Sequence, residues 1–218
     1  FFVFADITGS RDGTEYTYGS NSGSDNILTT EILDGSYNDI SFDTSSATKL
    51  TVRGENDAMA NWDNNTSLAI STDNITSVIS VEKVKLANNN DLKATSFIIS
   101  KGSIVNNNSK LIFDDITIKD TAFLYSNIEN IFTKQIVNDG NFSITAGQEN
   151  NIEIIGNGSL TIDDKFNVNA DITQSNVRID GKDGKVSSGI KASNSIKIGN
   201  GATVSGAVEN FEAGILEN

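Results

Sequence analysis

The stretch from residue 77 to residue 90 contains the pattern on which the fold prediction rests. It reads Ser77-Val-Ile-Ser-Val-Glu-Lys-Val-Lys-Leu-Ala-Asn-Asn-Asn90. Its centre is a β-branched residue, a glutamate, a polar residue and an apolar residue. The same order returns in Tyr125-Ser-Asn-Ile-Glu-Asn-Ile-Phe-Thr-Lys134 and in Ser205-Gly-Ala-Val-Glu-Asn-Phe-Glu-Ala213. Unequal spacing between the copies indicates a repeated structural unit that carries insertions.

The glutamates of the three copies should occupy equivalent places at the start of equivalent strands, if the repeat is structural. They are Glu82, Glu129 and Glu209. Neighbouring residues on a strand face opposite sides, so these glutamates should be exposed and the residues before them buried. Those preceding residues are Val81, Ile128 and Val208. The alternative is that half-buried strands produce this short pattern by chance.

Short β-branched runs separated by Asn, Asp, Gly and Ser recur about every ten residues, which predicts an all-β chain. Phe166-Asn-Val-Asn-Ala170 alternates apolar with polar residues, as a strand with one buried face does. The one segment that suggests a helical turn is Glu55 to Trp62, with Met59 and Trp62 on its apolar side.

Two architectures fit this strand rhythm, a right-handed parallel β-solenoid and an antiparallel β-sandwich. The chain has no proline, which suits strands with neighbours on both sides. Asparagine runs at 88–90 and 106–108 would place stacked amides at the corners of successive coils. Both favour the solenoid, with roughly 20 to 25 residues per coil. We predict a solenoid over residues 26–218 and an N-terminal arm and linker over residues 1–25. Gly156-Asn-Gly158 and Asp139-Gly140 are hairpin signals that favour the antiparallel alternative.

The composition excludes several classes of function. The chain contains no histidine and no cysteine, which excludes imidazole bases, thiolate nucleophiles, zinc fingers and disulfides. A net charge of −13 argues against nucleic acid and anionic membranes as partners. No apolar stretch approaches the length of a membrane span. Carboxylate and amide oxygens are the ligands that calcium prefers, so calcium is the cofactor that this composition favours.

One glycine-rich segment, Gly19-Ser-Asn-Ser-Gly-Ser-Asp-Asn-Ile-Leu28, resembles the calcium-binding nonapeptide of repeats-in-toxin proteins. The resemblance implies a calcium ligand at Asp25, and a weaker echo in Gly35 to Phe42 places another at Asp39. Ser20 and Asn21 replace two glycines of the family pattern, so a plain Gly/Asn turn is the alternative.

Carboxylates also follow several strands directly. They are Asp114, Asp115, Asp163, Asp164, Asp180 and Asp183. Adjacent strand residues point to opposite faces, so these pairs are poorly placed to form a catalytic acid and base. We interpret them as solvated turn residues and predict no catalytic site. A β-helix polysaccharide lyase or hydrolase remains the enzymatic alternative.

Taken together, the Glu phrases, the absent residue types and the degenerate calcium turn resemble bacterial surface-layer proteins exported by type I secretion. The resemblance implies a secreted structural protein at the bacterial cell surface that assembles with copies of itself and contacts cell-surface polysaccharide. The apolar residues Phe1, Phe2, Val3 and Phe4 are the predicted assembly segment. The segment from Ser193 to Gly206 is similar to one unit of trimeric adhesin heads and autotransporter passengers, so an adhesin is the alternative.

Overall fold

The computed structural model describes most of the chain. The described ranges are 7–11, 14–18, 27–32, 36–42, 49–54, 59–70, 77–148, 151–163, 166–168, 171–180, 185–186, 189–199, 201–210 and 215–217. Side chains are described within 49–54, 59–70, 77–145, 151–163, 171–180, 186, 189–199 and 201–208.

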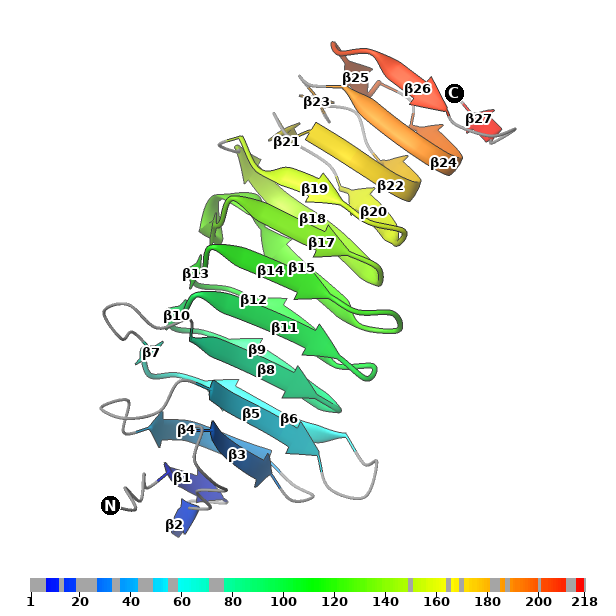
Figure 1. Cartoon of the computed structure of the whole chain (residues 1–218). Helices are drawn as coiled ribbons and strands as arrows, with labels where there is room; N and C mark the ends of the chain where they lie inside the picture. Colours follow the sequence, from blue (N-terminus) through cyan, green and yellow to red (C-terminus); the bar gives the residue numbers. More distant parts are fainter. Residues whose placement is uncertain are drawn as a thin grey trace.

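The chain forms a parallel β-solenoid, an elongated stack of coils with its described ends at opposite ends of the stack (Figure 1). Each coil passes through up to three strands, and each strand pairs in parallel with strands of the neighbouring coils. The predicted parallel stacking of strands in a β-solenoid is therefore confirmed, and the antiparallel sandwich is wrong. Asp139-Gly140 and Gly156-Asn-Gly158 join consecutive strands of one coil at a corner, and those strands pair with other coils instead of with each other.

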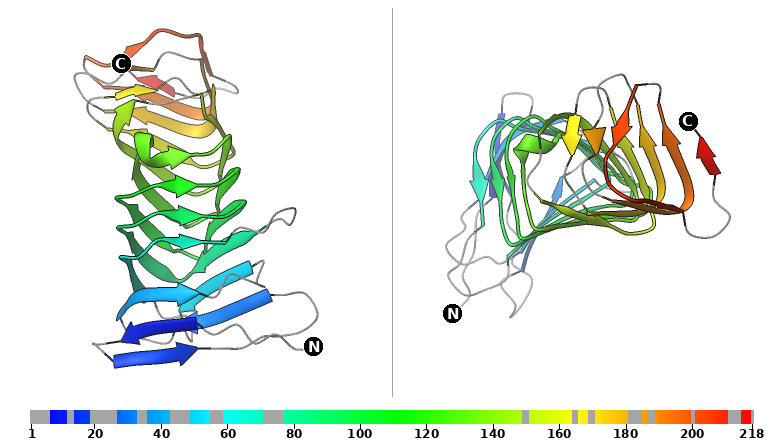
Figure 2. Two further views of the ribbon diagram at one scale, coloured as in Figure 1. Left: turned by 90° about the vertical axis from the view of Figure 1, so that its left-hand side faces the viewer. Right: turned by 90° about the horizontal axis from the view of Figure 1, so that it is seen from above.

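Three columns of parallel strands form the faces of the stack, which Figure 2 shows from the side and along its length. Face A contains β3 (Ile27–Ile32), β5 (Lys49–Gly54), β8 (Val78–Glu82), β11 (Ser96–Ser100), β14 (Asp115–Ile118), β17 (Gln135–Asn138), β19 (Glu153–Ile155), the first halves of β22 (Asp171–Ile179) and β24 (Ile190–Ile198), and β26 (Val208–Asn210).

Face B follows it along each coil. It contains β4 (Ser36–Phe42), β6 (Ala60–Asn64), β9 (Val84–Asn88), β12 (Ile104–Asn107), β15 (Phe123–Asn127), β18 (Asn141–Gln148), β20 (Ser159–Ile162), the second halves of β22 and β24, and β27 (Ile215–Glu217).

Face C has the shortest strands and comes in two sections. The first contains β7 (Leu68–Ala69), β10 (Leu92–Lys93), β13 (Leu111–Ile112) and β16 (Ile131–Phe132), and the second contains the end of β18, β21 (Phe166–Val168), β23 (Lys185–Val186) and β25 (Thr203–Val204). A 3₁₀ turn, η2 (Ile128–Asn130), precedes β16.

Coil length changes along the stack. Side chains in contact between neighbouring coils are 29 residues apart at Arg53 and Glu82, and 24 apart at Asn64 and Asn88. From Ser77 onward the separation falls to 17–20 residues, at or below the lower end of the roughly 20 to 25 expected. The longer coil, which begins with β5, contains the segments 55–58 and 71–76, and both segments lie outside the described ranges.

An antiparallel hairpin packs on the first coil. Strands β1 (Ile7–Arg11) and β2 (Thr14–Tyr18) pair with each other, and β1 also pairs antiparallel with β4. The Phe1 to Phe4 segment lies outside the described residues.

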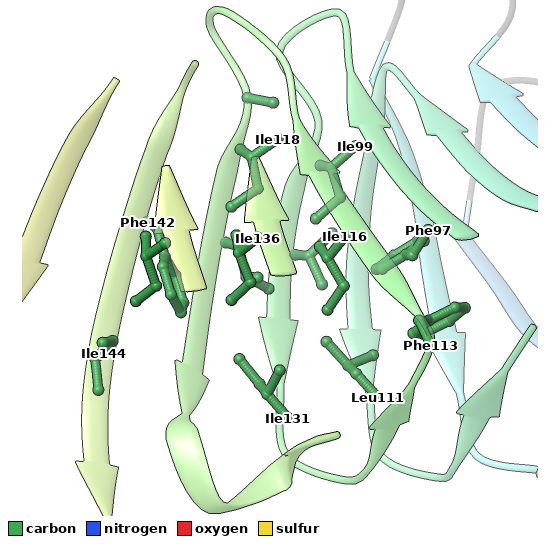
Figure 3. Close-up of a cluster of buried hydrophobic side chains, with 14 of the residues drawn as sticks. Phe97, Ile99, Leu111, Phe113, Ile116, Ile118, Ile131, Ile136, Phe142 and Ile144 are labelled. Atoms are coloured by element: carbon green, nitrogen blue, oxygen red, sulfur yellow. The ribbon is translucent and has the colours of Figure 1, made fainter. Parts of the chain in front are cut away.

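The core consists of apolar side chains stacked in columns between the faces (Figure 3). On face A one column is Ile79, Phe97, Ile116, Ile136 and Ile154, all fully buried. Phe97 stacks on Phe113 of the same coil with ring centroids 5.1 Å apart. This alternation of inward apolar and outward polar residues is what the period-two sequence pattern predicted.

Asparagine ladders join the coils at the end of face B, as the Asn runs predicted. Inside the stack, Asn64 Nδ2 donates to Asn88 Oδ1 and Asn88 Nδ2 to Asn107 Oδ1, each at 2.7 Å. Asn107 Nδ2 then donates to Ser126 Oγ at 2.9 Å, and Ser126 Oγ donates to the carbonyl of Asn127. A second, exposed ladder joins Asn65, Asn89 and Asn108.

The three glutamates do not occupy equivalent places, so that prediction is wrong. Glu82 ends β8 and is half-buried, whereas Glu129 lies in the η2 turn, where its backbone NH donates to Asn127 Oδ1. Glu209 is the middle residue of β26. Val81 and Ile128 are buried, but Val208 is 38% exposed.

The predicted helical turn is also not found where the chain is described. Residues 60–64 form strand β6, and Trp62 is fully buried in it, while Met59 is half-buried before it. Residues 55–58 lie outside the described part.

Candidate functional site

The side chains of the two predicted calcium ligands lie outside the described part of the structure. Asp25 lies outside the described residues, and Asp39 lies in β4, where the side chain is not described. Within the described ranges, no three or more Asp or Glu side chains converge on a point that could hold a metal ion.

The described carboxylates that follow strands have separate partners, either on a neighbouring coil or, for Asp180, two residues earlier on the same coil. Asp115 accepts a hydrogen bond from Ser96 Oγ at 2.9 Å, and exposed Asp114 pairs with Lys134 Nζ at 3.0 Å. Asp180 pairs with Arg178 Nε at 2.7 Å, which raises the pKa of Arg178. Asp164 and Asp183 lie outside the described residues. The adjacent pair Asp114 and Asp115 thus points to different surroundings, as expected of strand neighbours.

Glu82 is the most strongly paired carboxylate among the described side chains. Its Oε2 lies 2.7 Å from both Arg53 Nε and Lys101 Nζ, one from each neighbouring coil. Burial by itself would raise the pKa of Glu82, but the hydrogen bonds and charges of Lys101 and Arg53 outweigh it and lower the pKa. The cluster joins three successive coils, as a structural ion pair does.

One surface hollow, which we call the corner groove, lies where face C meets face A. Its volume is about 420 Å³, and its lining includes Lys93, Ile112, Asp114, Phe132 and Lys134. The Phe132 ring is 47% exposed, the largest exposure among the exposed large hydrophobic side chains of the described region. The groove therefore combines an uncovered apolar centre with two lysines on a strongly acidic chain.

A second hollow, which we call the face B hollow, lies on the outer side of β15, β18 and β20. Its volume is about 340 Å³, and it is lined by Phe123, Tyr125, Asn141, Phe142, Ser143, Ser159, Thr161 and Asp163. The rings of Phe123 and Tyr125 are nearly parallel, with centroids 6.3 Å apart and an interplanar angle of 4°. The two hollows share no lining residue.

Sequence reasoning missed both hollows. Phe123, Tyr125 and Phe132 lie within or beside the second Glu phrase, Tyr125 to Lys134, whose predicted feature was Glu129. The available signal was alternation: Leu124 is buried, so the aromatic residues on either side of it must face outward. The remaining lining residues come from other coils, and their arrangement depends on a register that one sequence does not reveal.

Comparison with protein-family models, with curated proteins and with solved structures found no match for this chain. Within the described ranges, no helix has both the length and the apolar character needed to cross a membrane.

Proposed function

We propose that the protein is a non-catalytic structural component of the bacterial cell surface, secreted and stabilised by calcium, that associates with copies of itself into an array. The corner groove carries this proposal. A solenoid presents the same kind of face along its whole length, so one lateral contact can align entire stacks. Phe132 and Ile112 supply an apolar centre for such a contact.

Charge favours a second copy as the occupant of the groove. Lys93 and Lys134 flank its apolar centre, although Lys134 is partly neutralised by Asp114. Elsewhere on face A, Asp115, Glu153 and Asp171 lie in register on nearby coils and form an acidic strip. A strip of this kind on one copy complements the lysines of the next, and complementary charge fixes the register of an interface.

The assembly test uses Phe132→Lys, which places a charge at the apolar centre of the groove. We expect the unaltered protein to self-associate in sedimentation velocity and to form sheets or filaments in negative stain. Phe132→Lys should remain folded and raise the dissociation constant for self-association at least about tenfold. Tyr125→Ala, at the other hollow, is the matched control and should assemble normally. An unaltered protein that stays monomeric at every concentration and calcium level contradicts the proposal.

The calcium part is tested separately, by thermal unfolding in millimolar calcium and in chelator. An ion that binds only the folded chain stabilises it by about 2.7 kcal/mol at a hundredfold excess over its Kd. We expect a higher Tm in calcium, and Asp25→Asn with Asp39→Asn should reduce the difference. Equal Tm values in calcium and chelator would show that calcium does not stabilise the isolated chain.

The Phe1 to Phe4 segment is proposed as a further connector between copies. Residues 7–11 form β1, which pairs with β4, so a deletion that keeps the hairpin must stop at residue 6. Loss of assembly in the folded 1–6 deletion supports the connector role. Normal assembly of that variant assigns self-association to the groove alone.

The alternative role, a surface adhesin, is favoured by the face B hollow.

A further inference from the structure

The face B hollow results from a change in side-chain size between neighbouring coils. In register along the stack, Phe123 is followed by Asn141 and Ser159, and Tyr125 by Ser143 and Thr161. Two aromatic rings on β15 therefore stand beside four short polar side chains on the next two coils. The rings form one wall, and the short side chains form the floor.

The floor is rich in hydrogen-bonding groups at regular intervals. It contains one amide, three hydroxyls and, at its edge, the Asp163 carboxylate, which accepts a long 3.4 Å hydrogen bond from Ser143 Oγ. Neighbouring coils are about 4.8 Å apart, so equivalent polar groups recur along the stack at about the length of one sugar ring. On the coil beyond Thr161, the register places Arg178, whose guanidinium is held by Asp180.

The aromatic wall is accessible to a ligand. Tyr125 is 37% exposed and Phe123 is half-buried. An aromatic ring left at the surface next to convergent polar groups is the combination found in small-molecule sites, where apolar area gives affinity and polar groups give orientation.

We propose that the face B hollow binds a neutral polysaccharide chain that runs along the stack. The C–H faces of sugar rings pack against Phe123 and Tyr125, and sugar hydroxyls hydrogen-bond to Asn141, Ser159 and Thr161. Asp163 accepts from sugar hydroxyls and, together with the net charge of −13, disfavours anionic polysaccharides. A peptide is less well matched, because the floor consists of side chains and offers no open strand edge for backbone pairing: β15, β18 and β20 are each paired with neighbours on both sides.

The test is isothermal titration calorimetry of the full chain with defined hexasaccharides. The neutral probes are cellohexaose, mannohexaose and chitohexaose, and the anionic probe is hexagalacturonate. We expect at least one neutral probe to bind, with an affinity that is the same at low and high salt, and no binding of hexagalacturonate. Failure of all three neutral probes to bind, or stronger binding of the anionic probe, would overturn the proposal.

Variants of the lining residues test whether the sugar binds at the face B hollow. Tyr125→Ala removes half of the aromatic wall and should raise Kd at least about tenfold, whereas Tyr125→Phe should retain binding. Thr161→Arg places a long side chain over the polar floor and should abolish binding by blocking the hollow sterically. Circular dichroism confirms that each variant is folded, which is expected because both side chains face outward.

Phe132→Ala is the matched control, since it removes an exposed aromatic ring at the corner groove. It should bind sugar normally. If it weakens binding as much as Tyr125→Ala, the hollow is not the site. The two proposals can be rejected separately. If the protein self-associates but binds no sugar, only this site is rejected. If it binds sugar but does not self-associate, only the array is rejected.

Discussion

Two kinds of corner hold successive coils together, and they use opposite chemistry. At the end of face B, buried asparagines at equivalent positions hydrogen-bond from coil to coil. At the corner between faces A and B, later coils use glycines that allow backbones to touch. The first corner depends on a side chain being present at each level, and the second depends on its absence.

The amide corner works because Asn88 and Asn107 each both accept and donate, while Asn64, at the described start of the ladder, donates to Asn88. A buried amide has a donor and an acceptor to satisfy, and a column of identical amides satisfies both by translation from coil to coil. The column ends where Ser126 directs its hydroxyl to a backbone carbonyl and the next coil carries Ile144 in that position. A ladder of this type needs the same residue at successive levels.

The glycine corner works by close approach. A Cβ on Gly140 would lie 2.4 Å from the carbonyl oxygen of Lys119, and one on Gly158 would lie 2.4 Å from that of Gly140. Earlier coils turn the same corner with Lys83, Lys101 and Thr121 at positive φ. Gly156 takes that role later, at φ 126°, beyond the region these residues reach. A side chain at Gly140 or Gly158 would therefore clash with the backbone of the preceding coil, whereas the amide corner requires a hydrogen-bonding side chain at each level.

Among the substitutions that test this comparison, Asn88→Ala, in the middle of the buried ladder, should lower the free energy of unfolding most. It removes the acceptor used by Asn64 and the donor used by Asn107. Each buried polar group left unsatisfied costs roughly 1–3 kcal/mol, so we expect a loss of about 2 to 6 kcal/mol in the free energy of unfolding. Urea unfolding followed by circular dichroism measures it.

The matched control is Asn89→Ala, one residue further on and in the exposed ladder. Water replaces the lost partner there, so the cost should stay within about 0.5 kcal/mol. Equal losses in the two variants would show that burial of the ladder is not what makes it stabilising.

The next largest effect should come from Gly158→Ala. The new methyl group meets the backbone oxygens of Gly140 and Asn138, at 2.4 and 2.7 Å, and neither atom can move independently of its own coil. Overpacking of this kind costs about 1–3 kcal/mol, measured by the same unfolding experiment. Gly189→Ala is the control, because its nearest contact is 3.3 Å and its φ is ordinary; a larger loss there than at Gly158 would contradict the close-approach argument.

The sequence predicted the features that depend on local order and missed those that depend on register between coils. Period-two alternation predicted strands, and the missing proline and the Asn runs at 88–90 and 106–108 favoured a parallel stack with amide ladders over the antiparallel alternative. The Glu phrase was misleading because it records only which side of the backbone a residue faces. Glu82 ends a strand and Glu129 lies in a 3₁₀ turn, yet both follow a buried residue. The face B hollow was missed because it exists only when Tyr125 is aligned with Ser143 and Thr161.

The smallest expected effect concerns the charged counterpart of the amide ladder, in which Glu82 joins Arg53 and Lys101 across three coils. Lys101 and Arg53 lower the pKa of Glu82 in the folded chain despite its partial burial. A lowered folded-state pKa means that the stabilisation is fully present above the unfolded value, near 4.3, and is lost as pH falls through the folded value.

Glu82→Gln should therefore be less stable than the unaltered protein at pH 7, and the difference should shrink as pH falls below about 4. Both cations are partly exposed, with side-chain exposures of 38% and 56%, so the difference at pH 7 should not exceed about 1 kcal/mol. Lys101→Met removes one of the two cations. It avoids a glycine, which would also change the backbone preference at this position of positive φ. Urea unfolding of the four proteins of this double-mutant cycle, from pH 3 to pH 7, isolates the pair. If the coupling energy does not change with pH, packing and not charge accounts for the contact between Glu82 and Lys101. The amide ladder would then be the stronger of the two side-chain ladders at every pH.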